Sequence, residues 1–252
     1  MCLIVVALGA SPRYPLIVAA NRDERHARPT ARAAWWSDQS RVLGGRDLEA
    51  GGSWLAMNRG GRFAAVTNIR EAQRPVGKSS RGSLVADFVT DLAPSAEHAA
   101  RAVHDGAAFG PFNLFLYDGR ELMFASNRAA AARLDSGTHS FSNAPAGIEW
   151  PKTASARAGV ERLLSHAAPL EPLFALLAER DEVGTPEQRY QRTHFVVGPV
   201  YGTRCSTVVL VDGSGQATFA ERSFDATGHA VAEVRETFEL EGGASLAPQG
   251  ER

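Results

Sequence analysis

Cysteine is scarce in this sequence. There are only two in 252 residues, Cys2 and Cys205, which is too few for a disulfide framework or a cysteine-rich zinc site. A chain with only two cysteines fits a reducing compartment best, so we expect a cytoplasmic protein. The seven histidines are scattered along the chain, without the HxxxH or HExxH spacing of a zinc site. We therefore expect no metal site.

Long apolar runs and an excess of one charge are also missing. No run approaches the ~20 apolar residues that span a bilayer, and the start lacks the basic region of a signal peptide. The formal net charge is -1, so no bulk electrostatic field favours nucleic acid or an anionic membrane. We expect neither a transmembrane segment nor a nucleic-acid partner.

The sequence does contain many short apolar runs joined by turn residues. Four pairs of such runs have strand length and are rich in β-branched and aromatic residues, which predicts antiparallel hairpins. Helical periodicity occurs in two further blocks. The predicted strand pairs are 2–8 with 15–20, 53–58 with 62–69, 112–118 with 121–126 and 204–211 with 216–223. The predicted helices are 83–92, 95–106, 153–167 and 172–180.

This order of elements predicts the fold class. Antiparallel hairpins with segregated helices are typical of α+β layers. No linker, repeat or low-complexity segment divides the chain, so we expect one domain over residues 1–252, with a polar tail from about residue 242. Two glycine pairs, Gly44-Gly45 and Gly51-Gly52, have neither Walker nor Rossmann spacing, and we interpret the segment around them as a shaped loop.

A cluster of polar residues follows the second predicted strand. The stretch AANRDERHARP, residues 19–29, places Asn21, Arg22 and Asp23 together. A solvated turn is one interpretation. The other depends on Cys2, one strand earlier, which becomes the first residue if Met1 is removed. An N-terminal cysteine carries a thiol and an α-amine with a pKa of ~7.7–8.0, so the amine can act as general base for its own thiol. The simpler alternative is that Cys2 is a small apolar residue at the start of a buried strand.

Six further segments favour the catalytic interpretation, because together with NRDE they form an ordered pattern. On this pattern the chain resembles the NRDE family, the transport and Golgi organisation protein 2-like group, over residues 1 to 225. That family in turn resembles N-terminal-nucleophile hydrolases of the cholylglycine hydrolase and penicillin V acylase type. The segments are 44–70, 80–88, 111–119, 140–145, 150–152 and 201–211.

The resemblance implies a fold and a set of catalytic residues. The fold is a four-layer αββα sandwich, with two antiparallel sheets packed face to face and helices outside. Cys2 falls at the nucleophile and Asp23 at an aspartate that accepts a hydrogen bond from it. Asn68 and Asn143 fall at two asparagines that can stabilise an oxyanion, and Arg204 at a late arginine that can lower the pKa of Cys2 or hold Asp23.

One position departs from the hydrolase pattern. Ala20 stands where those enzymes carry an arginine, three residues before Asp23. Arg22 cannot replace that arginine unless a bulge re-aims it, because side chains alternate faces along a strand. This departure favours altered or absent hydrolase activity.

Four residues near these positions are candidates for substrate binding. Asn21 shares the predicted face of Asp23, and Arg22 lies between the two. Trp54 could line an apolar cleft, and Arg70 ends the segment that contains Asn68.

Two classes of function remain. The first is a hydrolase or acyltransferase that acts on an amide or thioester bond, with Cys2 as nucleophile and without a cofactor. The second is a non-catalytic carrier on the same fold, for haem or acyl-lipid ligands, since the family has been linked to lipid metabolism and haem movement. Haem ligation needs an accessible His, Cys, Met or Tyr beside an apolar cleft, and His26, His139, His194 and Cys2 are the candidates.

Overall fold

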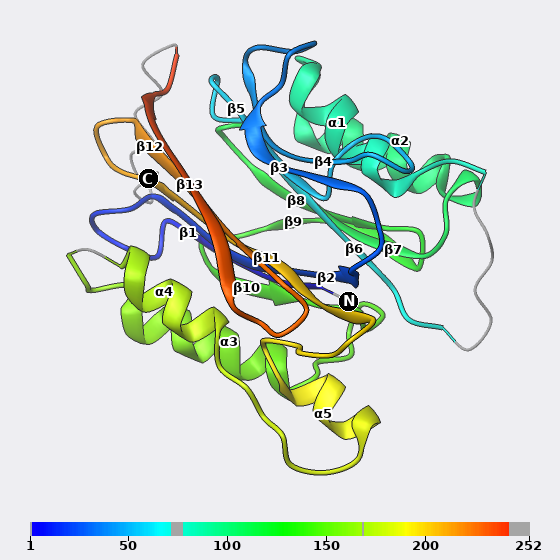
Figure 1. Cartoon of the computed structure of the whole chain (residues 1–252). Helices are drawn as coiled ribbons and strands as arrows, with labels where there is room; N and C mark the ends of the chain where they lie inside the picture. Colours follow the sequence, from blue (N-terminus) through cyan, green and yellow to red (C-terminus); the bar gives the residue numbers. More distant parts are fainter. Residues whose placement is uncertain (1, 72–77, 168, 242–252) are drawn as a thin grey trace. The chain divides into compact units, whose positions relative to one another are not determined.

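The computed structural model describes residues 2–71, 78–167 and 169–241 (Figure 1). The polar tail predicted from residue 242 lies outside the described residues. Contacts divide the chain into two compact units, and each is built from non-contiguous segments. Unit 1 comprises Met1–Cys2, Ala27–Leu134 and Phe141–Glu149, and unit 2 comprises Leu3–His26, Asp135–Ser140 and Trp150–Arg252.

Unit 1 contains a seven-stranded sheet in which every strand pairs with its neighbour in the sequence. The strand order is β3-β4-β5-β6-β7-β8-β9, and all pairings are antiparallel. The sheet is therefore an antiparallel meander, and the connection between β6 and β7 contains the helices of the unit. Its strands are β3 (Thr30–Trp35), β4 (Val42–Asp47), β5 (Leu55–Asn58), β6 (Phe63–Asn68), β7 (Phe112–Tyr117), β8 (Leu122–Ser126) and β9 (Ala129–Leu134).

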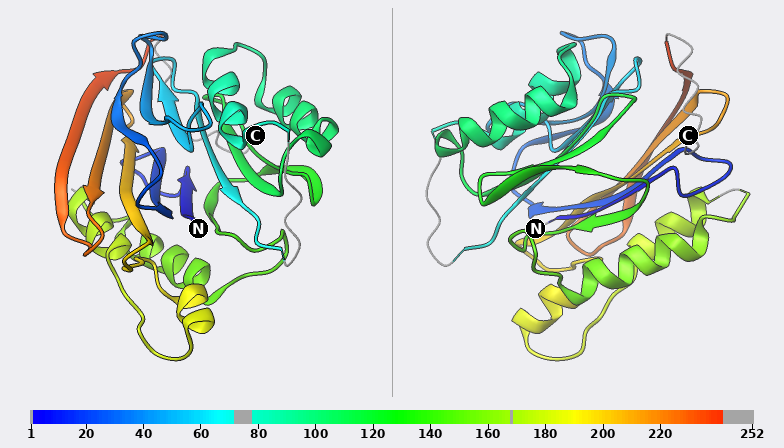
Figure 2. Two further views of the ribbon diagram at one scale, coloured as in Figure 1. Left: turned by 45° about the vertical axis from the view of Figure 1, so that its right-hand side comes forward. Right: turned by 180° about the vertical axis from the view of Figure 1, so that it is seen from behind.

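Helices α1 (Arg81–Thr90) and α2 (Ser95–His104) cover one face of this sheet, followed by the short 3-10 helix η1 (Gly106–Ala108). Both views of Figure 2 show α1 and α2 on the same side of the strands. Val85 and Phe88 of α1 pack in one core with Val66 of β6 and Leu114 of β7. Alternate residues of these strands therefore face away from the helices.

Unit 2 contains a six-stranded sheet in the order β10-β1-β2-β11-β12-β13. The pairings of β11 with β2 and β12, and of β12 with β13, are antiparallel. Helices α3 (Pro151–Leu163), α4 (Leu170–Leu177) and α5 (Pro186–Arg192) belong to this unit. The strands are β1 (Cys2–Leu8), β2 (Leu16–Arg25), β10 (Gly137–Phe141), β11 (Tyr201–Val211), β12 (Gln216–Phe224) and β13 (Ala230–Glu239).

The core of unit 2 lies between its sheet and α3 and α4. Leu3 of β1, Ile17 of β2 and Val208 of β11 pack against Val160 of α3 and Leu173 of α4. Odd-numbered residues of β2 therefore face the helices at this point, and even-numbered residues face away from them.

The structure confirms the predicted α+β class, with two antiparallel sheets, and the predicted hairpins and helices. It also contains elements that the sequence analysis did not assign, namely β3, β4, β9, β10, β13 and α5. No helix in the part of the chain that the structure describes is long and apolar enough to cross a membrane.

The prediction of a shaped loop around Gly44-Gly45 is wrong, because both glycines lie inside strand β4. A Cβ atom added to Gly44 would lie 2.7 Å from the backbone oxygen of Leu55 on the adjacent strand. Gly44 therefore allows two strands to approach closely. Gly52 lies outside the strands, with a φ of +74° that favours glycine.

Candidate active site

Cys2 is held at both ends of its backbone by two consecutive residues of unit 1. Its N–H donates a hydrogen bond to Oδ1 of Asn143 over 2.9 Å, and its carbonyl accepts one from the Ser142 hydroxyl over 2.6 Å. The cysteine is a free thiol and is half-buried. The first residue of β1 therefore has a fixed backbone and a side chain that is partly open to solvent.

The segment that holds Cys2 is itself fixed by β6 and β7. The Thr67 hydroxyl donates to the Ser142 carbonyl over 2.6 Å, and Nδ2 of Asn113 donates to the Ala144 carbonyl over 2.9 Å. Thr67 and Asn113 are direct partners in the β6–β7 register. They alternate with residues that pack on α1 and α2, so this segment lies on the face of the sheet away from those helices.

Asn143 uses its whole amide group within the protein. Its side-chain oxygen accepts a hydrogen bond from the Cys2 N–H, and its Nδ2 donates one to the backbone carbonyl of Asn68. The backbone carbonyl of Asn143 accepts a further hydrogen bond from the Arg70 N–H over 2.8 Å. These bonds fix the plane of the amide beside the N-terminal residue. Asn143 is therefore a positioning residue for Cys2 in this structure.

Asn68 and Arg70 differ from Asn143 in the exposure of their side chains. Both residues are exposed, and no hydrogen bond holds the Asn68 side chain among the residues that the structure describes. Asn68 is the last residue of β6, and its backbone is tied to Asn143. Its amide is therefore a donor that a ligand at this position can use.

The end of β2 in unit 2 carries three buried polar residues, Asn21, Arg22 and Asp23. Nδ2 of Asn21 donates to the carbonyls of Leu177 and His194 over 2.8 and 2.9 Å. Its Oδ1 accepts from the Ser206 hydroxyl. Since both polar atoms of this amide are bonded inside the protein, Asn21 joins the end of α4 to the sheet.

Asp23 is a buried carboxyl group with an altered pKa. Its Oδ1 accepts a hydrogen bond from the Thr203 hydroxyl over 2.7 Å, and its backbone carbonyl accepts one from the Tyr201 hydroxyl over 2.8 Å. Burial raises the pKa of the Asp23 carboxyl, while the charge of Lys152 and the hydrogen bond from Thr203 oppose this rise. The net direction is upward because removing an ionised carboxylate from water is costly.

Lys152 is a residue to which the sequence analysis gave no role. It lies in the first turn of α3, is fully buried, and its charge acts on Asp23. Its ammonium lies 5.6 Å from the centre of the Trp150 ring, within the range of a cation–π contact. Segment 150–152 belongs to the family pattern, which was the one available signal, but a lysine is rarely expected in a core.

Arg204 occupies a bulge in β11. The register shifts between Thr203, which pairs with Asp23, and Cys205, which pairs with Arg22. Its guanidinium donates to the carbonyls of Arg25 and His26 over 3.0 and 3.1 Å. Burial and the nearby charge of Arg22 lower the pKa of Arg204. The side chain thus holds the end of β2 beside Asp23.

The geometry gives little support to Trp54 as a substrate-binding residue or to His194 as a haem ligand. Trp54 is buried. Both ring nitrogens of His194 are bonded: Nδ1 donates to the Leu176 carbonyl over 2.9 Å, and Nε2 shares a hydrogen bond with the Ser155 hydroxyl over 2.7 Å. His194 therefore does not fit as a haem ligand. His26 and His139 each bond one backbone carbonyl.

The predicted residues thus fall into two groups. Cys2, Asn68, Asn143 and Arg70 come together in unit 1, and Asn21, Arg22, Asp23 and Arg204 come together in unit 2. The hydrogen bond between Asp23 and Cys2 stays a prediction, because the two residues belong to different units. Among the described ranges there is no group of three or more His, Cys, Asp or Glu residues that could hold a metal ion.

Comparisons with known proteins agree with the pattern of motifs. The family model described as Transport and Golgi organisation 2 matches residues 1–226. The Transport and Golgi organization protein 2 homolog of Bos taurus is 34% identical over 257 residues, covering 88% of this chain and 93% of that protein. The Homo sapiens homolog is 32% identical over 258 residues, with the same coverage.

Solved structures of a hydrolase share the fold. A variant of conjugated bile acid hydrolase from Clostridium perfringens matches with a TM-score of 0.54 and 9% identity, covering 95% of this chain and 98% of that one. A second variant of the enzyme matches with a TM-score of 0.50 and 9% identity, covering 95% and 97%. At this identity the likeness shows the fold alone.

Proposed function

Since this chain belongs to the Transport and Golgi organisation 2 family, we propose that it is a hydrolase or acyltransferase that cleaves an amide or thioester bond with Cys2 as N-terminal nucleophile. The observation that carries this proposal is the way Cys2 is held. Asn143 and Ser142 fix its backbone on both sides, while the residue as a whole is only half-buried. The nitrogen that Asn143 holds is the one that becomes the α-amine when Met1 is removed.

The chemistry begins with removal of Met1, which frees the α-amine of Cys2. The neutral amine takes the thiol proton, and the thiolate sulfur attacks the carbonyl carbon of the acyl compound. When the tetrahedral intermediate collapses, the bond to nitrogen or sulfur breaks, and the leaving group takes the proton from the amine. Water, or an acceptor nucleophile, then attacks the thioester on Cys2 and restores the thiol.

The proposed oxyanion site uses the exposed amide of Asn68. Asn143 keeps its own amide engaged with Cys2 and the Asn68 backbone, so it holds the nucleophile in place. The Asn68 side chain is free to donate to the negative oxygen of the intermediate. Removing one such donor costs about 3–4 kcal/mol of transition-state stabilisation in known enzymes.

The first experiment compares the reactivity of the two cysteines. Intact mass should show a chain without Met1, and iodoacetamide at neutral pH should label Cys2 much faster than the buried Cys205. Cys2→Ala should abolish the fast labelling and any turnover of acyl amides and acyl thioesters. Cys2→Ser should keep the fold but turn over far more slowly, because a hydroxyl is a weaker nucleophile.

Cys205→Ala is the matched control and should keep both the fast labelling and the turnover. Retention of Met1 in folded protein would remove the amine base and end the proposal. Equal and slow labelling of both cysteines, with turnover or ligand binding unchanged in Cys2→Ala, would instead favour a carrier of haem or acyl lipids on the same fold.

A further inference from the structure

A cavity of about 580 Å³ lies in unit 1, on the helix-covered side of the seven-stranded sheet. Its walls come from facing sides of α1 and α2, through Leu84 and Asp87 on the first helix and Ala102 and Asp105 at the second. Sites for small molecules commonly have volumes of about 300–1,000 Å³. The space is therefore large enough for a small organic ligand.

The floor of the cavity is apolar. Leu114 and Leu116 of β7 contribute to it, and both are buried in the core that the helices share with the sheet. Leu84, Ala108 and Phe109 also line the cavity and are only half-buried. They keep apolar surface that a ligand can cover, and burial of apolar surface is favourable.

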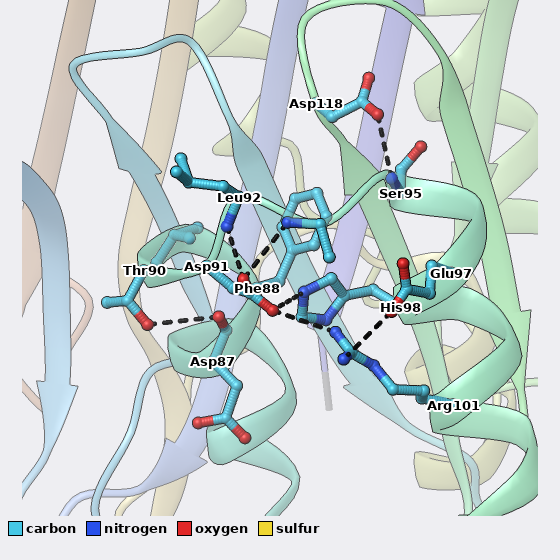
Figure 3. A network of polar contacts seen from close by, with 12 residues as sticks. Asp87, Phe88, Thr90, Asp91, Leu92, Ser95, Glu97, His98, Arg101 and Asp118 are labelled. Carbon is cyan, nitrogen blue, oxygen red and sulfur yellow. Dashed lines mark hydrogen bonds and ion pairs between the residues drawn. The ribbon is translucent and has the colours of Figure 1, made fainter.

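The positive groups at the cavity are already compensated. The Asp91 carboxylate accepts from Nε2 of His98 over 2.9 Å and from Arg101 over 3.1 Å, and Arg101 also lies 3.4 Å from Glu97. Figure 3 shows this network between the two helices. Burial lowers the pKa of His98, which disfavours the cationic form of its ring. No cation here is left for an anionic ligand.

Two carboxylates at the cavity, unlike the positive groups, make no direct ion pair within the described residues. Asp87 and Asp105 are exposed and line the cavity, and no hydrogen bond or ion pair engages either side chain within the described part of the chain. Figure 3 shows the Asp87 carboxylate apart from the network, without a contact. Burial raises the pKa of the Asp87 carboxyl, and the charges of His98 and Arg101 oppose this rise only in part.

We propose that this cavity binds a small amphipathic cation, an apolar body with a protonated amine that pairs with Asp87 and Asp105. The apolar lining holds the body of the ligand, and the amine forms the direct ion pair that neither carboxylate makes within the described residues. The carboxylates and the apolar lining therefore favour the same class of ligand.

This site is distinct from the one proposed around Cys2. The Ser142–Asn143 segment lies on the face of β6 and β7 that carries Thr67 and Asn113. The cavity lies on the other face, with Leu114 and Leu116. Ligand binding in the cavity therefore does not depend on the chemistry of Cys2.

The test uses dansylcadaverine, which joins an apolar fluorophore to a primary amine, and its N-acetylated form as the neutral control. Fluorescence titration of the full chain should show saturable binding of the amine, at least fivefold tighter than that of the acetylated form. Asp87→Asn should weaken binding of the amine five- to tenfold, because it removes the charge with little change of shape. Leu84→Trp should abolish binding by filling the space from α1.

Glu97→Gln is the matched control: it removes one negative charge from the neighbouring helix α2, outside the cavity lining, and should change affinity less than twofold. Cys2→Ala should bind the probe as the unmodified chain does. The proposal fails if the amine does not bind saturably or if the acetylated form binds as well. It also fails if Asp87→Asn and Glu97→Gln behave alike, or if Cys2→Ala loses binding. If Leu84→Trp does not fold, the affinity of Asp87→Asn for the amine tests the proposal by itself.

Discussion

Asp23 illustrates how a single buried carboxyl can reduce the stability of the protein that contains it. Its pKa is raised by burial, so the folded state binds the proton more tightly than the unfolded chain. Its contribution to stability is fully present below the pKa of the unfolded chain and is lost as the pH rises through the raised pKa. Above the raised pKa the protein contains an ionised carboxylate where a neutral group would be more stable.

We therefore expect Asp23→Asn to gain stability relative to the unmodified protein as the pH rises above the ordinary range of aspartate. The amide keeps an oxygen for Thr203 but cannot ionise. Urea unfolding of both proteins at a series of pH values from 4 to 8 measures the difference in the free energy of unfolding. Parallel curves would show that the carboxyl titrates alike in both states.

Asp225 provides a control of opposite sign. The hydrogen bond from Thr227 lowers the pKa of this exposed carboxyl, so its contribution is present above the unfolded pKa and is lost as the pH falls through the lowered one. Asp225→Asn should therefore lose stability relative to the unmodified protein as the pH rises. This is the reverse of the trend expected for Asp23→Asn.

At the same scale, the sequence identified some site residues and missed others. Cys2 was found from its position after Met1, but Asn68 and Asn143 were found only through the family pattern, since 141 positions separate Cys2 from Asn143 and no local rule joins them. Asn21 was expected to bind substrate, but its amide is occupied by the carbonyls of α4 and of His194. Lys152 was missed because its burial depends on the tertiary packing of α3.

At the scale of elements, Gly44 marks the closest approach of two strands. Gly44→Val should lower the free energy of unfolding by about 1–3 kcal/mol, the usual cost of overpacking a core, because its Cβ would meet the β5 backbone at 2.7 Å. Gly213→Ala is the control: a Cβ there meets nothing within 4 Å, and the change should be near neutral or slightly stabilising. Thermal unfolding monitored by circular dichroism compares the two, and equal effects would contradict the packing argument.

The elements that the sequence predicted are those with local signals. The hairpins β5–β6, β7–β8 and β11–β12 have buried strands on either side of a tight turn, so pattern and turn agree. Strand β13 escaped notice because it is an edge strand with mostly exposed residues and little apolar alternation. Strand β4 was missed because it contains two glycines, which are depleted in strands. Gly44 is needed there because the neighbouring strand approaches closely.

At the scale of the whole molecule, the units are interleaved along the chain. Strands β1 and β2 come first, yet their sheet is completed by β11, β12 and β13 near the other end. A chain cut after residue 149 keeps all segments of unit 1 but loses α3 and α4. The apolar rows of β1 and β2 that pack on those helices, Leu3 and Ile17 among them, would be left uncovered.

We expect this fragment to aggregate or to lack a cooperative thermal transition, as measured by circular dichroism and size-exclusion chromatography. A chain cut after residue 241 is the control and should unfold as the full chain does, because it retains every described strand and helix. A soluble fragment 1–149 with a sharp transition would mean that β1 and β2 do not need the later segments.

The pairing of β2 with β11 can form only late in the synthesis of the chain. Val18 pairs with Val209, and a ribosome that adds about 5–20 residues per second needs about 10–40 s to make the chain between them. During this interval the first hairpin has left the ribosome without its neighbouring strand. The nascent amino terminus is then open to an aminopeptidase, so the maturation that would create the proposed nucleophile can precede the folding that surrounds it.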